Sequence, residues 1–326
     1  MSTISVIIPN YNRAALIGET LDNVLAQSRA PDEVIVVDDG STDDSVAVIA
    51  RFGERVTLIR QENSGPGAAR NRGLAVARGD LIQFMDSDDL WSLNKLAAQE
   101  RALARSGADF AYSPWLQARL EDGRALYADP VLQQRPLPPK RSPSAWFLRG
   151  WVVVFQSCLF RRRLLDAVGP YREDLMPTED SELLWRIVRS GARLVHVADA
   201  LLLYRLHGGE QISQSSNTQG KRAVDFMRYL AAVNAALDDA PGVTPADLRQ
   251  WHRRAAVVER AIAGVDQRSL LERARERIGE TAGHVARKLA GSAWPEWYQA
   301  APLTAPQAGL VHALGYVPQL VPHAEL

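Results

Sequence analysis

The stretch Gln83-Phe84-Met85-Asp86-Ser87-Asp88-Asp89 joins an apolar run to a segment with helical spacing, and the rest of the chain is organised around it. Leu81 to Met85 is typical of a buried strand, so the three carboxylates come where that strand should end. Carboxylates this close repel one another unless a cation or a hydrogen-bond donor lies between them. Hard divalent ions such as Mg²⁺ and Mn²⁺ usually bind one or two carboxylates together with substrate phosphates. The stretch therefore fits a metal site that holds a diphosphate, although Asp88 or Asp89 could simply cap a helix starting near Trp91.

Strand-like and helix-like segments alternate four times over about 105 residues around this stretch, the pattern of an open parallel sheet wrapped by helices. We expect strands at 5–9, 34–37, 56–59 and 81–85, and helices at 16–25, 44–51, 68–77 and about 90–105. Such sheets bind ligands in the crevice beyond the carboxyl ends of their strands, so Asp39 and Asp86, which both follow strands, should face that crevice. The first strand leads into neither a G-x-G-x-x-G turn nor a lysine-bearing phosphate loop. Carboxylates and a metal, rather than a glycine cradle, should therefore hold the ligand.

Composition narrows the classes of partner and compartment. The 326 residues suggest about two domains. Lys+Arg and Asp+Glu are both 38, and this lack of net charge argues against a nucleic-acid polymer as partner. Cys158 is the only cysteine, which excludes an intrachain disulfide and suits a reducing cytosol. The apolar runs at 151–155 and 194–203 are too short to span a bilayer, and the N-terminus lacks the basic region of a signal peptide. We expect a cytoplasmic chain, either soluble or lying on the inner face of a membrane.

The regular alternation stops at Ser113. Asp122-Gly123 predicts a hairpin turn, because this pair tolerates positive φ. Further strands are expected at 151–160, 194–197 and 200–204, a helix start at 177–182, an extended loop at 135–143 and a basic, flexible loop at 205–209. From about 220 to 289 the spacing is helical, whereas the residues from Trp294 onward support no prediction. The mixed charges of the helical part favour packing on the rest of the chain, or pairing between subunits, over lying on an anionic membrane. We divide the chain at 1–112, 113–217 and 218–326.

Four motifs, in order and at the usual spacings, resemble those of the family 2 glycosyltransferases. They are Ser5–Asn12, Val37–Asp43, Glu62–Gly73 and Phe84–Asp89, with looser matches at Thr178–Asp180 and Tyr204–His207. The resemblance implies an α/β chain of the GT-A fold, a mostly parallel sheet flanked by helices, here with a C-terminal helical appendage. It also implies inverting transfer of a sugar from a nucleotide diphosphate, most often a UDP-sugar, to a hydroxyl of a glycan or lipid-linked glycan. A role in bacterial surface glycans follows only by analogy.

The resemblance also implies roles for single residues. Pro9, Tyr11, Asp39, Arg70, Asp86 and Arg205 would form the donor site. Within it, Asp39 would accept a hydrogen bond from the base, Arg70 would approach the base or the diphosphate, and Asp86 would contact the ribose or the metal shell. Asp88 would bind the Mn²⁺ or Mg²⁺, with His207 at the metal or the diphosphate. Asp180 would be the general base that takes the proton of the acceptor hydroxyl. A single displacement with one base inverts the anomeric centre.

Simpler structural roles remain open for some of these residues. Asp180 could cap a helix, as Thr178 could, and His207 could be an ordinary loop histidine. Arg161-Arg162-Arg163 is more typical of a solvated face than of a phosphate site. Two other functions also remain: a sugar-nucleotide nucleotidylyltransferase, whose glycine- and lysine-rich loop is missing, and a catalytically silent nucleotide-sugar binding module, which the retention of Asp88 and Asp180 disfavours.

Overall fold

The computed structural model describes residues 2–129, 132–208, 219–263, 298–300, 303 and 305–322. A seven-stranded sheet lies at its centre, in the order β11-β6-β10-β4-β1-β2-β3. Its strands are β1 (Ile4–Asn10), β2 (Glu33–Asp38), β3 (Thr57–Arg60), β4 (Leu81–Phe84), β6 (Phe110–Tyr112), β10 (Cys158–Arg161) and β11 (Leu194–His196). Every neighbouring pair is parallel except the two pairs made by β10. The predicted mostly parallel α/β sheet is confirmed.

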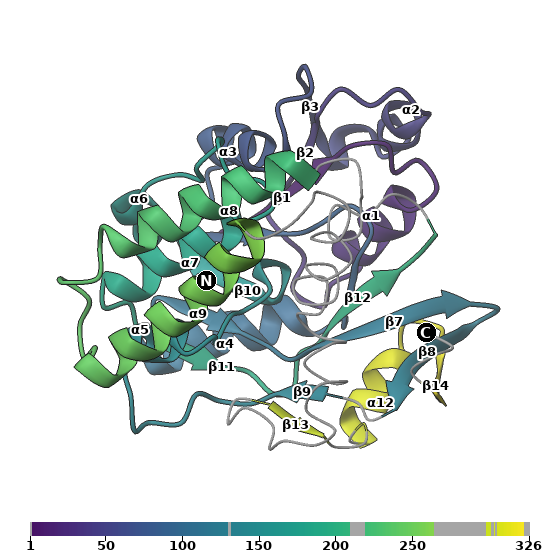
Figure 1. Ribbon diagram of the computed structural model, residues 1–326. Helices are drawn as coiled ribbons and strands as arrows, with labels where there is room; N and C mark the ends of the chain where they lie inside the picture. The colour runs from purple at the N-terminus through teal and green to yellow at the C-terminus, as the bar shows by residue number, and fades with distance from the viewer. Residues whose placement is uncertain are drawn as a thin grey trace.

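Helices cover both faces of this sheet (Figure 1). The first helices are α1 (Ile17–Leu25), α2 (Ser45–Ala50), α3 (Pro66–Val76) and α4 (Lys95–Ser106). Val6 and Ile8 of β1 pack with α1 and α4, whereas Ile7 faces α3 on the other side, as the alternation of side chains along a strand requires. α3 comes so close to β1 that a Cβ at Gly73 would lie 2.4 Å from the side chain of Ile7. Strands buried on both faces explain why apolar runs predicted them.

Two predicted boundaries were wrong. The helix expected from Leu90 begins at Lys95, with Asn94 as its N-cap, so Asp88 and Asp89 do not cap it. Leu90 and Trp91 instead form a short strand, β5, which pairs with β12 (Leu202–Leu206). The strand expected at 151–160 is confined to β10, because a 3-10 turn at Phe155–Ser157 precedes it.

A second sheet of five strands, in the order β14-β8-β7-β12-β5, lies beside the first. β7 (Trp115–Glu121) and β8 (Arg124–Asp129) form the predicted hairpin, with φ of 48° at Asp122 and 70° at Gly123. The sequence supported no prediction for the residues after 297. Two strands from this part of the chain pair with strands from its middle part. β13 (Tyr298–Ala300) pairs with β9 (Leu132–Gln134), and β14 (Val317–Pro322) runs parallel to β8; the four strands are labelled in Figure 1.

Two helices between residues 219 and 263 share the main hydrophobic core. α8 (Gln219–Asn234) and α9 (Pro245–Ala263) pack on α5 (Pro143–Leu148) and α7 (Glu179–Arg189). Tyr229 and Trp251 are buried in the same cluster as Phe147 and Trp185. The helical periodicity predicted beyond 263 falls outside the described residues. No helix in the described part of the chain is long and apolar enough to cross a membrane.

Asp247 anchors the start of α9. Its buried side chain accepts hydrogen bonds from the backbone N–H and hydroxyl of Thr244, at 3.0 and 2.6 Å. It also pairs with Arg141 at 3.2 Å and with Arg149 at 2.6 Å, on the segment that leads into and out of α5. This carboxylate therefore ties the C-terminal helices to the rest of the fold.

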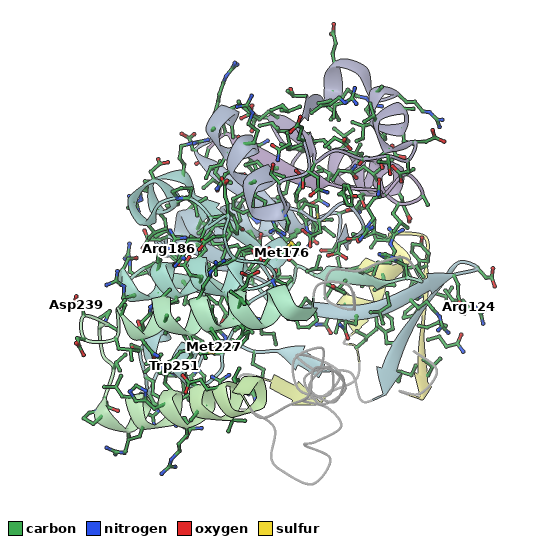
Figure 2. All side chains as sticks on the ribbon, turned by 45° about the horizontal axis from the view of Figure 1, so that its top comes forward. Arg124, Met176, Arg186, Met227, Asp239 and Trp251 are labelled. Atoms are coloured by element: carbon green, nitrogen blue, oxygen red, sulfur yellow. The ribbon has the colours of Figure 1, made fainter. Side chains whose placement is uncertain are left out.

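We expect Asp247→Ala to lower the free energy of unfolding by about 2 kcal/mol, because a helix cap and two charge-assisted hydrogen bonds are lost together. Denaturant unfolding at pH 7 measures this loss, with Asp239→Ala as the control because Asp239 is exposed in the turn between α8 and α9 (Figure 2). Burial opposes the charge of Asp247, but the bonds from Thr244 and Arg149 lower its pKa below the ordinary value. The stabilisation is therefore present at neutral pH and is lost as pH falls through that lowered pKa. An effect that grows in acid would contradict this account.

Candidate active site

The acidic loop after β4 gathers three carboxylates at the carboxyl edge of the central sheet. Oxygens of Asp86, Asp88 and Asp89 lie within 4.8 Å of one another. A hard divalent cation prefers such oxygen ligands. The loop is braced from α1, where the hydroxyl of Thr20 donates to the carbonyl oxygens of Ser87 and Asp89. The residues present fit a bound Mg²⁺ or Mn²⁺.

Asp88 lies between two nitrogen donors. Nε of Arg13 donates to its Oδ2 at 2.8 Å, and Nε2 of His207 lies 3.1 Å from the same oxygen. Burial opposes the charge of Asp88, but the hydrogen bond from His207 and the charge of Arg13 lower its pKa below the ordinary value. The structure therefore brings the two predicted metal residues together and keeps Asp88 ionised. Arg13 was not singled out from the sequence, since only the fold places it beside Asp88.

Asp89 connects the acidic loop to β12. Its Oδ1 accepts a hydrogen bond from the backbone N–H of Arg205 at 2.9 Å, whereas its buried Oδ2 accepts none from the described residues. Burial and the charges of Asp88 and Asp86 raise the pKa of Asp89 well above the ordinary value. An orphaned carboxylate oxygen beside two others is what a site for a cation requires.

Arg70 joins the acidic loop to the start of α7. Its guanidinium is buried and donates to Asp86 at 2.9 Å and to Glu179 at 3.1 Å. Nη1, the nitrogen that donates to Glu179, also lies 3.7 Å from Oδ1 of Asp180. We expected Arg70 near the base or the diphosphate, whereas here it lies among three carboxylates. It thereby places Asp86 and the expected catalytic base, Asp180, around one positive charge.

Glu179 and Asp180 differ in their access to solvent. The side chain of Asp180 is 31% exposed and that of Glu179 only 7%. Burial and the neighbouring Asp180 raise the pKa of Glu179 to about 7, although Arg70 opposes this. The N-cap of α7 is Thr178, whose side chain makes no capping hydrogen bond. Glu179 was not predicted as a site residue, although it lies within the motif that suggested Asp180.

Asp86 is also held from its other side. The side-chain amide of Gln156 donates to Oδ2 of Asp86, and the backbone oxygen of Gln156 accepts from Gln83 at 3.1 Å and from Trp91 at 2.9 Å. Gln83 in turn accepts from the fully buried amine of Lys95, whose pKa burial lowers well below its ordinary value. These residues form a buried polar network under the acidic loop. Gln156 could not be found from the sequence, because no motif near it indicates that it packs beside the acidic loop. Only the tertiary fold brings it to Asp86.

The residues expected at the nucleotide lie at the ends of β1 and β2. Asp39 is buried, and its oxygens accept from the backbone N–H groups of Ser64 at 2.9 Å and Gly65 at 2.8 Å and from the side chain of Gln61 at 2.7 Å. It therefore shapes the loop after β3, and its bond to a base stays a prediction. Tyr11 is 45% exposed immediately after β1, whereas Pro9 is buried within that strand.

The sequence did not predict the partners of Arg205 or of the arginine run at 161–163. Nη1 of Arg205 lies 2.7 Å from Oε2 of Glu19 on α1. Arg161 and Arg162 donate to backbone oxygens near the ends of α4 and α3, so they are structural, and only Arg163 has the solvated position that we expected of all three.

Known sequences are similar to this chain over much of its length. A sequence model described as "Glycosyl transferase family 2" matches residues 5–169. An uncharacterized glycosyltransferase of Nostoc sp. is 28% identical over 252 residues, which cover 72% of this chain and 74% of that protein. The succinoglycan biosynthesis protein ExoU of Rhizobium meliloti is 31% identical over 255 residues, covering 72% of this chain and 69% of that protein.

Solved structures share the fold at low identity. The mannosyltransferase PcManGT of Pyrobaculum calidifontis, in complex with GDP-Man and Mn²⁺, has a TM-score of 0.54 and 22% identity over 90% of this chain and 76% of its own. Residues 1–349 of S. aureus TarS, in complex with UDP-GlcNAc, have a TM-score of 0.53 and 20% identity over 88% of this chain and 91% of their own. Both matches extend over nearly the whole of the present chain.

Proposed function

The chain belongs to glycosyl transferase family 2, and we propose that this glycosyltransferase moves a sugar from a nucleotide diphosphate to an acceptor hydroxyl with inversion at the anomeric carbon. One observation carries the proposal. Arg70 holds Asp86 of the acidic loop and lies 3.7 Å from Asp180, so the groups suited to the diphosphate and to the acceptor proton lie around one guanidinium. Family membership leaves no support for a nucleotidylyltransferase.

We infer that the acidic loop holds the donor through a divalent metal. Asp88 would be the main ligand because it is kept ionised, with Asp86 and His207 close enough to complete the site. When bound, the metal would offset the charge that grows on the leaving diphosphate. Arg13 and Arg205 supply further positive charge around Asp88 and Asp89, which suits an oxyanion.

Asp180 is the better placed of the two carboxylates at the start of α7 to act as base. Its side chain reaches solvent, where an acceptor hydroxyl can approach, whereas Glu179 is enclosed and bonded to Arg70. A base that removes the hydroxyl proton as the new bond forms makes the oxygen a stronger nucleophile. With one base and one displacement, the sugar is transferred with inverted configuration.

The donor that we propose is a UDP-sugar, and the acceptor a hydroxyl of a glycan or lipid-linked glycan met at the cytoplasmic face of a membrane. The UDP-GlcNAc bound by TarS supports a UDP-sugar as donor. The name of ExoU, a succinoglycan biosynthesis protein, supports a glycan acceptor. The GDP-Man bound by PcManGT makes GDP the alternative to test.

A thermal-shift experiment tests the donor. UDP, GDP, ADP and UMP are each added with Mn²⁺ or with a chelator. A ligand present at 100 times its Kd stabilises the native state by about 2.7 kcal/mol, so UDP with Mn²⁺ should raise the Tm clearly. The shift should vanish with chelator, and UMP should give a smaller one because it lacks the second phosphate. A larger shift with GDP would reassign the nucleotide, and no shift with any diphosphate would contradict the proposal.

A further inference from the structure

A residue from the C-terminal part of the chain contacts α1 close to the acidic loop. The hydroxyl of Tyr316 donates to Oε1 of Glu19 at 2.6 Å, although 297 positions separate the two in the sequence. The other oxygen of Glu19, Oε2, lies 2.7 Å from Nη1 of Arg205. Burial and the charge of Glu19 raise the pKa of Tyr316 to about 12, so its hydroxyl keeps its proton at neutral pH.

The fold holds Tyr316 firmly in this position. It lies between α12 (Ala305–His312), whose Val311 is fully buried, and β14, which pairs with β8. The next residue, Val317, donates its backbone N–H to the oxygen of Gly123 in the hairpin at 2.8 Å. β14 and β12 belong to the same five-stranded sheet (Figure 1). Tyr316, which immediately precedes β14, and Arg205, which lies within β12, are therefore fixed on one framework.

Without Tyr316, the pair between Glu19 and Arg205 would be weakly ordered. The side chain of Glu19 is 42% exposed, and an ion pair with such an exposed partner contributes little because the carboxylate remains mobile in water. A second hydrogen bond fixes the carboxylate and, through it, the guanidinium. Arg205 is only 6% exposed, and its backbone N–H holds Asp89, so its side chain starts from the edge of the acidic loop.

We propose that Glu19 and Tyr316 are positioning residues that hold the Arg205 guanidinium for the second phosphate of the donor. The C-terminal segment at 305–322 thereby takes part in donor binding, although the family match ends at residue 169. The inference rests on the proposed function, because it requires a nucleoside diphosphate at the acidic loop.

The test compares UDP with UMP in the 326-residue chain with Mn²⁺, by calorimetric titration. Tyr316→Phe removes one hydroxyl and should raise the Kd of UDP about 3- to 10-fold, which corresponds to the loss of one hydrogen bond. The Kd of UMP and the Tm should stay unchanged. Two controls should change neither Kd. Val317→Ala alters a 55% exposed residue next to Tyr316, and Glu54→Gln alters an exposed residue far from Tyr316 in the sequence.

A double-mutant cycle shows whether Tyr316 acts through Glu19. Glu19→Ala alone should weaken UDP binding at least as much as Tyr316→Phe, and adding Tyr316→Phe to it should have no further effect. Additive effects, or an equal loss for UDP and UMP, would overturn the inference. If the unaltered protein binds neither UDP nor GDP, the proposed function itself fails. Binding of UDP with no effect of Tyr316→Phe removes only the positioning role.

Discussion

Replacing Asp180 by asparagine should lower the rate of sugar transfer by about 10²–10⁴, the usual contribution of a general base, while donor binding stays nearly intact. Asparagine has the size of aspartate but cannot accept the proton of the acceptor hydroxyl. Oδ1 of Asp180 makes no hydrogen bond to the described residues and only faces Arg70 at 3.7 Å. Arg70 keeps its bonds to Asp86 and Glu179 in the variant, so the fold should be retained. Initial rates of UDP release with acceptor, together with the Kd of UDP, measure the two effects separately.

Asp174→Asn is the matched control for this change. Asp174 is exposed and pairs with Arg172 two residues away, and it belongs neither to the acidic loop nor to the partners of Arg70, so the rate should not change. If Asp180→Asn instead abolishes UDP binding while the residual transfer rate per bound donor stays normal, Asp180 belongs to the donor site. In that case Glu179, with its pKa near 7, becomes the candidate base.

Asp88→Asn should reduce transfer by about 10²–10³, comparable to the loss of one preorganised electrostatic contact. The substitution removes the carboxylate that Arg13 and His207 keep ionised, so the metal loses its best ligand. UDP binding should lose most of its dependence on Mn²⁺, because the metal joins the diphosphate to the protein. Titrations of UDP with Mn²⁺ and with chelator measure that dependence directly.

Asp44→Asn serves as the control, since Asp44 is an exposed N-cap of α2 that makes no side-chain capping bond. It should keep both the rate and the response to Mn²⁺. Full activity of Asp88→Asn in the presence of chelator would show that the site does not depend on a metal.

The central sheet could be predicted because its strands are local signals. β1, β2 and β4 are apolar runs that end in polar turns, and burial on both faces makes such runs continuous. β5 could not be predicted, since Leu90 and Trp91 fit the spacing of the following helix. They form a strand because they pair with Leu202 and Leu203, more than a hundred residues away. β14 depends in the same way on β8, which lies far from it in the sequence.

The candidate site likewise has one part that the local sequence predicts and another that depends on the tertiary fold. The acidic loop was evident from the sequence because three carboxylates follow one strand. The neighbours that tune them, Arg13, Gln156 and Glu179, come from separate elements that only the tertiary fold brings together. Arg70 was recognised as a site residue, but its partners depend on how α3 meets α7.

The slow hydrolysis of an α-linked UDP-sugar in the absence of acceptor tests the central claim most directly. Water then takes the place of the acceptor hydroxyl, and proton NMR identifies the released anomer before it mutarotates. We predict that the β-anomer forms first, only with Mn²⁺ or Mg²⁺, and far more slowly with Asp180→Asn. Release of the α-anomer, or no release from a protein that binds the donor, would contradict an inverting transferase with Asp180 as its base.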